Sequence, residues 1–203
     1  MNIKLRIKQH IMENSWQYIL VVAILFIGLV VGNYKALRLE GEVKSHLLTM
    51  IDSYLQGGIS DGLDSKNIFL KAFYSQAKTV VTIWFLGLTV IGLPLILGVI
   101  FLRGFSVGFT VGFLCQQKAS AGILISILSI LPQNLVYIPF LILAAVLALN
   151  FSLYIVKGKN SHMLPLGQGL ITYSLLMLIC LLIFSGGALI EAYLSPWFLS
   201  LAL

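Results

Sequence analysis

Long apolar runs alternate with short polar stretches along this chain, and the run lengths predict membrane-spanning helices. A helix needs about 20 apolar residues to cross the hydrocarbon core of a bilayer. Four runs approach or exceed that length, at residues 16–32, 79–102, 136–155 and 167–190. The pattern predicts an all-α fold, a polytopic integral membrane helical bundle of about five transmembrane spans once one interrupted segment is included.

That interrupted segment covers residues 104–131, where the polar stretch 115–120 separates two short apolar pieces. Each piece is too short for a full span, so we expect one broken or re-entrant segment. The pattern leaves open whether the break lies within the membrane or at its surface. Gly104, Gly108 and Gly112 recur every fourth residue here, which predicts one smooth helix face that a second backbone approaches closely.

The one extended polar region, residues 33–78, is expected to form an amphipathic extracytoplasmic loop within a single membrane domain, 1–203. Within it, Val43 to Leu55 carries apolar residues at helical spacing, and Gly57-Gly58 is expected to end that helix. A second helix is expected to start near Asp64 or Ser65 and to continue without a break into the span at 79–102. An apolar face on such a loop indicates contact with the membrane surface or with a partner.

Composition and charge agree with a chain that lies in lipid, and they constrain its orientation. Hydrophobic residues make up 59%, charged residues 10%, and mean hydropathy is +1.01. The basic residues stand singly at the ends of apolar runs, which favours topology anchoring and contact with anionic lipid and argues against nucleic-acid binding. A cytoplasmic N-terminus, with Lys4, Arg6 and Lys8, also places Lys157 and Arg103 on the cytoplasmic side and the 33–78 loop outside.

The sequence contains few residues in patterns that could support catalysis. No carboxylate stands between Asp64 and Glu191, and no nucleophile elbow, phosphate-binding loop or zinc-protease motif occurs. The three histidines lack metal-spaced neighbours, and Cys115 and Cys180 lie in apolar sequence, as is typical of inert buried thiols. We therefore predict no catalytic, cofactor-binding or metal-binding residue and expect a protein that is not an enzyme.

Four polar residues near apolar runs form a candidate polar motif: Arg103, Gln133, Asn134 and Glu191. Arg103 either marks an interfacial helix end or binds a carbonyl, lipid phosphate or carboxylate. The expected topology places it on the opposite side of the membrane from Glu191. Gln133 and Asn134 either satisfy carbonyls freed by neighbouring prolines or line a polar cavity.

Four stretches in a characteristic order carry a resemblance to a known family. They are Ile68-Phe69-Leu70 leading into Phe85-Leu86-Gly87, then Arg103 to Phe109, Leu131 to Pro139, and Ile190 to Pro196. In order and spacing the chain resembles the stage II sporulation protein M family over nearly its whole length. The wider family often has a histidine and a glutamate near Pro132, and their absence here removes the groups that a proton or ion relay would use.

The resemblance implies a non-enzymatic membrane scaffold of the peptidoglycan-degrading engulfment machinery in endospore formation. It implies that the protein recruits and holds two cell-wall hydrolases, stage II sporulation proteins D and P, in the engulfing septal membrane of a bacterial cell. The alternative is a transporter or channel subunit, which the polar residues within apolar sequence would serve. The sequence leaves open whether copies of the chain associate with one another.

Overall fold

The computed structural model describes residues 9, 11–60, 65–125, 130–157 and 166–194, and these are almost entirely helical. The helices are α2 (Ser15–Leu37), α3 (Gly41–Ser60), α4 (Ser65–Gly87), α5 (Gly92–Ile125), α6 (Leu131–Lys157) and α7 (Leu166–Leu189), followed by the π-helical turn η3 (Ile190–Leu194). No strand occurs in these ranges. The predicted all-α bundle is confirmed.

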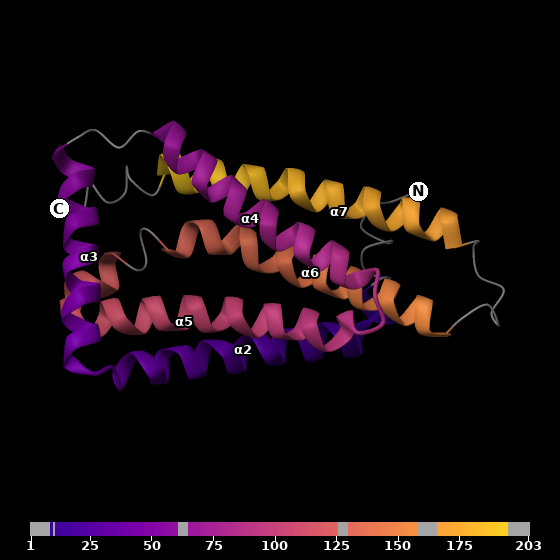
Figure 1. The fold of residues 1–203 in the computed structure, drawn as a ribbon, viewed down its shortest axis with the longest axis horizontal. Helices are drawn as coiled ribbons and strands as arrows, with labels where there is room; N and C mark the ends of the chain where they lie inside the picture. Colours follow the sequence, from indigo (N-terminus) through magenta and orange to yellow (C-terminus); the bar gives the residue numbers. More distant parts are fainter. Residues whose placement is uncertain (1–8, 10, 61–64, 126–129, 158–165, 195–203) are drawn as a thin grey trace.

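Five helices lie side by side, while α3 crosses one end of the bundle at a steep angle to them (Figure 1). Helices α2 and α5 run in the same direction, because Gly28 lies against Phe105 and Gly32 against Phe109. Helices α4 and α5 form a hairpin and therefore run in opposite directions. Alternation of direction continues through α6 and α7 (Figure 1).

Four of the described segments are long and apolar enough to cross a membrane: Ser15–Leu37, Gly92–Gln117, Pro132–Val156 and Gly167–Ala192. Most of their outward side chains are apolar, as lipid contact requires; Ile19 and Phe26 on α2 are examples, while Ser106 and Thr110 on α5 are exposed polar residues. The protein is therefore a multi-pass membrane protein. Helix α4 packs in the same bundle, but it carries Lys66, Lys71 and Lys78 and does not meet the same standard of apolarity.

The expected single span at 79–102 is wrong, because a tight turn at residues 88–91 divides it into α4 and α5. Backbone hydrogen bonds close the turn, and the buried hydroxyl of Ser152 donates to the carbonyl of Thr89 at 2.8 Å. Pro94 lies in the first turn of α5, where its missing N–H costs nothing, and does not kink a longer helix. The turn is itself apolar, so the hydrophobic pattern conceals it.

The expected break at 115–120 is also wrong, since α5 continues through it as an unbroken helix to Ile125. Helix α5 has 34 residues. About 20 residues of helix suffice to cross the hydrocarbon core of a bilayer, so α5 extends well beyond that layer. The polar residues 115–120 lie within this one continuous helix. Residues 126–129 lie outside the described part of the chain.

The polar stretch 33–78 comprises the end of α2, all of α3 and the first part of α4, and the α4 part packs in the bundle and is not a separate loop. Helix α3 contains the predicted amphipathic stretch, but Gly57 and Gly58 do not end it, because it continues to Ser60. The start of the next helix at Ser65 is confirmed. Glycine only weakens a helix by about 1 kcal/mol, so a pair of glycines does not suffice to terminate one.

Helix α6 lies at the centre of the bundle. Its alanines Ala144, Ala145 and Ala148 are fully buried, and their small side chains let neighbouring helices approach closely. The core around them includes Ile83 from α4, Ile100 from α5 and other large apolar residues from every spanning helix. This packing holds the start of α6 and the end of α7 beside the middle of α5, where the polar residues gather.

Candidate functional site

A tight helix contact joins α2 to α5 through glycines on both helices. An added Cβ at Gly104 would lie 3.2 Å from the backbone nitrogen of Leu29, and one at Gly28 would lie 3.0 Å from that of Phe105. Gly108 and Gly112 continue the same face, opposite Leu29 and Asn33. We call Gly104, Gly108 and Gly112 the glycine stripe; α2 covers it, so it is an internal packing surface and is not open to a partner.

The α2 half of this contact went unrecognised in the sequence. Gly28, Gly32 and Ala36 repeat a small residue every fourth position and are all buried. Their spacing is the same signal that identified the glycine stripe on α5. Sequence reasoning treated α2 as a simple anchor and therefore missed the partner of the stripe.

A polar cavity of about 190 Å³ lies between α4, α5, the start of α6 and η3. Its lining comes from segments far apart in the sequence: Ala72, Ser75, Gln76, Arg103, Ser106, Val107, Thr110, Ile130, Gln133, Asn134 and Glu191. All four residues of the predicted polar motif are present. A polar cavity among membrane helices is unusual, because polar side chains there need partners that lipid does not supply.

Glu191 is held from two sides. The hydroxyl of Tyr137 donates to Oε2 of Glu191 at 3.1 Å. A carboxylate only accepts hydrogen bonds, so the Gln133 amide takes the orientation in which its Nε2 donates to the same Oε2 at 2.9 Å. The Tyr137 ring stacks on Phe184 with centroids 5.5 Å apart, and Gly187 leaves room for it.

Arg103 lies in the same cavity as Glu191, so the expected separation of the two is wrong. The position of Arg103 differs from the expected one because of the turn at 88–91. Helix α5 begins at Gly92, so Arg103 lies well inside this helix and not at a helix end. Its guanidinium carbon lies 5.7 Å from the centre of the Tyr137 ring. Its charge also interacts with the carboxyl group of Glu191 across the cavity.

The two neighbouring amides of α6 differ in their contacts. Asn134 donates from Nδ2 to the carbonyl of Ile130 at 2.8 Å and so completes the start of the helix. Gln133 instead faces the cavity and binds Glu191. The Oδ1 of Asn134 is buried and has no hydrogen-bond donor among the described residues. A buried acceptor without a donor costs free energy in the folded protein.

Several lining residues escaped the sequence analysis. Gln76 is 5% exposed and lies on the apolar face of α4, next to Ala72. A glutamine inside a helical apolar repeat is a detectable signal, but the supposed loop around it obscured the repeat. Tyr137 was also missed as the donor to Glu191, since nothing in the local sequence links α6 to η3.

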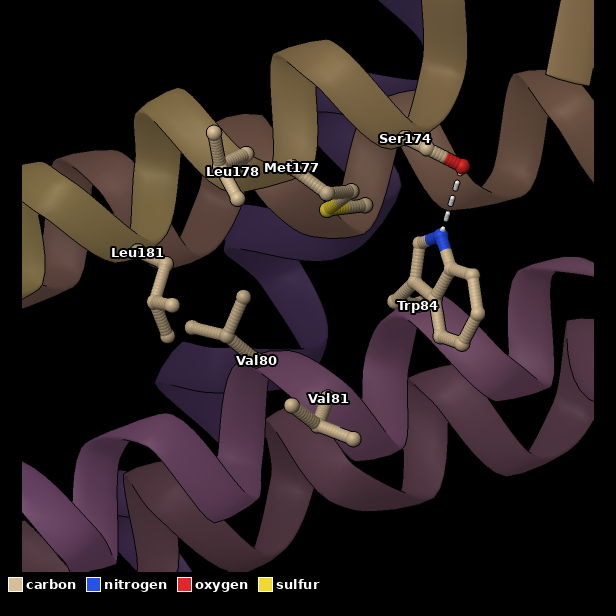
Figure 2. A pocket seen from close by; sticks show the side chains of 7 residues that line it. All are labelled: Val80, Val81, Trp84, Ser174, Met177, Leu178 and Leu181. Carbon is tan, nitrogen blue, oxygen red and sulfur yellow. Dashed lines mark hydrogen bonds between the residues drawn. The ribbon is translucent and has the colours of Figure 1, made fainter. Parts of the chain in front are cut away.

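Helix α4 contacts α7 through an apolar groove of about 230 Å³ (Figure 2). At one end of the groove, the indole Nε1 of Trp84 donates to the hydroxyl of Ser174 at 3.1 Å. Further along the groove, Val80 faces Leu181 (Figure 2). These contacts place the second half of α4 beside the middle of the α7 span. The groove offers no polar chemistry.

The chemistry available in the cavity is hydrogen bonding and charge recognition. It holds one guanidinium, one carboxyl group and several amides and hydroxyls. Among the described residues, no group of three or more His, Cys, Asp or Glu side chains could hold a metal ion. The site is thus a polar cavity between the helices of a multi-pass membrane protein.

Comparison with known families identifies the chain more closely. The family model described as stage II sporulation protein M matches residues 18–196, which include the glycine stripe and the whole cavity. The chain belongs to the stage II sporulation protein M family and is a sporulation-related membrane protein. No curated protein and no solved structure matches it.

Proposed function

We propose that this protein is a non-enzymatic membrane scaffold of the engulfment machinery in endospore formation. It recruits and holds two peptidoglycan hydrolases, stage II sporulation proteins D and P, at the engulfing septal membrane. Membership of the stage II sporulation protein M family supports this role. The structural observation that carries it is α3, an amphipathic helix laid across one end of the bundle (Figure 1).

Helix α3 is suited to contact other molecules. It does not pack extensively on any other described helix, and its described apolar residues include Val43 and Met50, which are 47% and 57% exposed. An amphipathic helix in this position lies in the membrane interface or binds a partner. With the N-terminus in the cytoplasm, α3 is on the outer side of the membrane, where peptidoglycan is.

The cavity supports a scaffold more than an enzyme. Its one carboxyl group, Glu191, accepts hydrogen bonds from Tyr137 and Gln133. These contacts link α6 to η3, so we assign the three side chains to holding the helices together. A second copy, lipid and the two hydrolases are the partners that a scaffold of this form would contact.

One observation favours a second function, a transporter or channel subunit. Arg103 and Glu191 face a polar cavity at membrane depth, and intramembrane ionisable groups often mark a substrate path. In proteoliposomes, flux that is lost on Gln133→Leu would support transport. Tight liposomes under several ion and solute gradients would contradict it.

The scaffold is tested by affinity purification from sporulating cells after mild solubilisation. We expect both hydrolases to co-purify with the tagged protein. Replacing Leu47 and Leu48 on α3 by lysine should abolish their recovery, whereas lysines at the exposed hydroxyl positions Ser45 and Thr49 of the same helix should preserve it. Purification of the unaltered protein without either hydrolase, even after crosslinking, would contradict the proposal.

A further inference from the structure

Helix α4 lies at the same depth as the spanning helices. Gln76 lines the polar cavity with Arg103, which is inside the span Gly92–Gln117. Further along α4, Trp84 bonds to Ser174, which is inside the span Gly167–Ala192. The outward side of α4 between Gln76 and Trp84, which includes Lys78 and Thr82, therefore faces hydrocarbon unless another molecule covers it.

The outward face of this helix is mixed: Leu70, Tyr74 and Val81 are exposed and suit lipid, but a line of mainly polar residues runs beside them. Lys71, Ser75, Lys78, Thr82 and Phe85 are all exposed, and we call these residues the α4 seam. The outward residues of α2, by contrast, are apolar, Phe26 among them. Lysine is among the residues least tolerated at the centre of a bilayer. Direct contact of this face with acyl chains is therefore unfavourable.

The spacing of the α4 seam is that of a helix contact. Its members are separated alternately by four and three residues, the repeat that keeps one face of a helix against a second helix over several turns. Ser75 and Thr82 are small, which lets another backbone approach closely in a membrane. Ser75 also lines the polar cavity, so the seam leads directly to Arg103.

Charge decides what kind of helix fits. The face presents Lys71 and Lys78, and Ser75 joins it to the cavity in which Arg103 interacts electrostatically with Glu191. The chain has no carboxylate of its own between Asp64 and Glu191, and Glu191 is already bound by Tyr137 and Gln133. Two copies meeting at this face would oppose lysine to lysine. The occupant must therefore be a different chain that brings negative charge.

We propose that the α4 seam and the adjoining polar cavity form the docking surface for a transmembrane helix of a different protein, whose carboxylate side chain pairs with a lysine of the seam. The unsatisfied Oδ1 of Asn134 and the buried Gln76 provide further polar contacts at the same place. This inference rests on the proposed scaffold function, because it specifies where and how one membrane partner is held.

A synthetic helix tests the surface without knowledge of the partner. The purified full chain is reconstituted in phosphatidylcholine vesicles with a fluorescent leucine-rich transmembrane peptide that carries one central glutamate, and association is measured by energy transfer. We expect it to bind about threefold to tenfold more tightly than the same peptide with leucine in place of glutamate. The double variant Lys71→Leu/Lys78→Leu should lose this preference, while Lys35→Leu at the exposed end of α2 should keep it.

Leucine on an outward membrane face does not threaten folding, so loss of the preference reports on recognition. Equal binding of the glutamate and leucine peptides to the unaltered protein would overturn the inference, as would an undiminished preference in the double variant. If the hydrolases fail to co-purify but the glutamate peptide is preferred, the scaffold function fails and the docking surface stands. If the hydrolases co-purify and both peptides bind alike, the function stands and the docking surface fails.

Discussion

A single methyl group on the glycine stripe should destabilise the bundle, and α5 supplies its own control. In Gly108→Ala the new Cβ would lie 2.7 Å from the carbonyl carbon and 2.8 Å from the Cα of Leu29. Both are backbone atoms of α2 and cannot rotate away. Gly98, on the same helix, has no atom within 4 Å of the equivalent position, so Gly98→Ala adds a methyl group in open space.

The size of the effect follows from the distances. Ordinary van der Waals contact begins near 3.4 Å, so α2 and α5 must separate by at least about 0.7 Å to clear the carbonyl carbon of Leu29, and further to clear its carbonyl oxygen, which lies closer. A gap of about 0.5–1 Å forfeits roughly a quarter to a half of each contact energy along the interface. Overpacking of this kind costs about 1–3 kcal/mol. Gly98→Ala should be neutral or slightly stabilising, because alanine is the better helix former.

Unfolding in mixed micelles of rising SDS fraction, followed by circular dichroism, measures both variants under the same conditions. We expect the Gly108→Ala transition at a clearly lower SDS fraction than that of the unaltered protein, and the Gly98→Ala transition unchanged or higher. Coincident transitions for the two variants would refute the close backbone contact of α2 and α5.

Three further predictions concern the cavity, the α4–α5 turn and the cysteines. Tyr137→Phe removes the hydrogen bond to the buried carboxyl group and should cost about 1 kcal/mol in the same SDS titration; no change would argue that the bond does not form. Ser152→Ala leaves the carbonyl of Thr89 without its donor and should destabilise by a similar amount, whereas a neutral result would indicate that water replaces the hydroxyl. A membrane-permeant maleimide should label the half-buried Cys115 much faster than the buried Cys180, and equal rates, measured by mass spectrometry, would contradict the packing of α7.

The sequence predicted the fold class because lipid imposes a simple length and polarity rule. Each of the spans at 16–32, 136–155 and 167–190 is essentially one helix in the structure. The rule failed where an apolar turn resembled part of a span, at residues 88–91, and where a helix continued through a polar stretch, at residues 115–120. In both places hydropathy reports the surrounding solvent and not the backbone conformation.

The candidate site was predictable residue by residue but not as an assembly. Arg103, Gln133, Asn134 and Glu191 stood out as polar groups in apolar sequence, and all four line one cavity. Their proximity depends on where the α4–α5 turn falls and on α6 meeting the middle of α5. Contacts between distant segments leave no periodic signal in a single sequence, so the link from Tyr137 to Glu191 needed the structure.

The central claim is that this protein holds two hydrolases at once. It is tested most directly by reconstituting the purified full chain in nanodiscs with full-length stage II sporulation proteins D and P and weighing the complexes by mass photometry. The account predicts one species that contains the membrane protein and both hydrolases, formed in higher yield than either pair. Hydrolases that bind each other but not the nanodisc, or that displace one another from it, would contradict the scaffold.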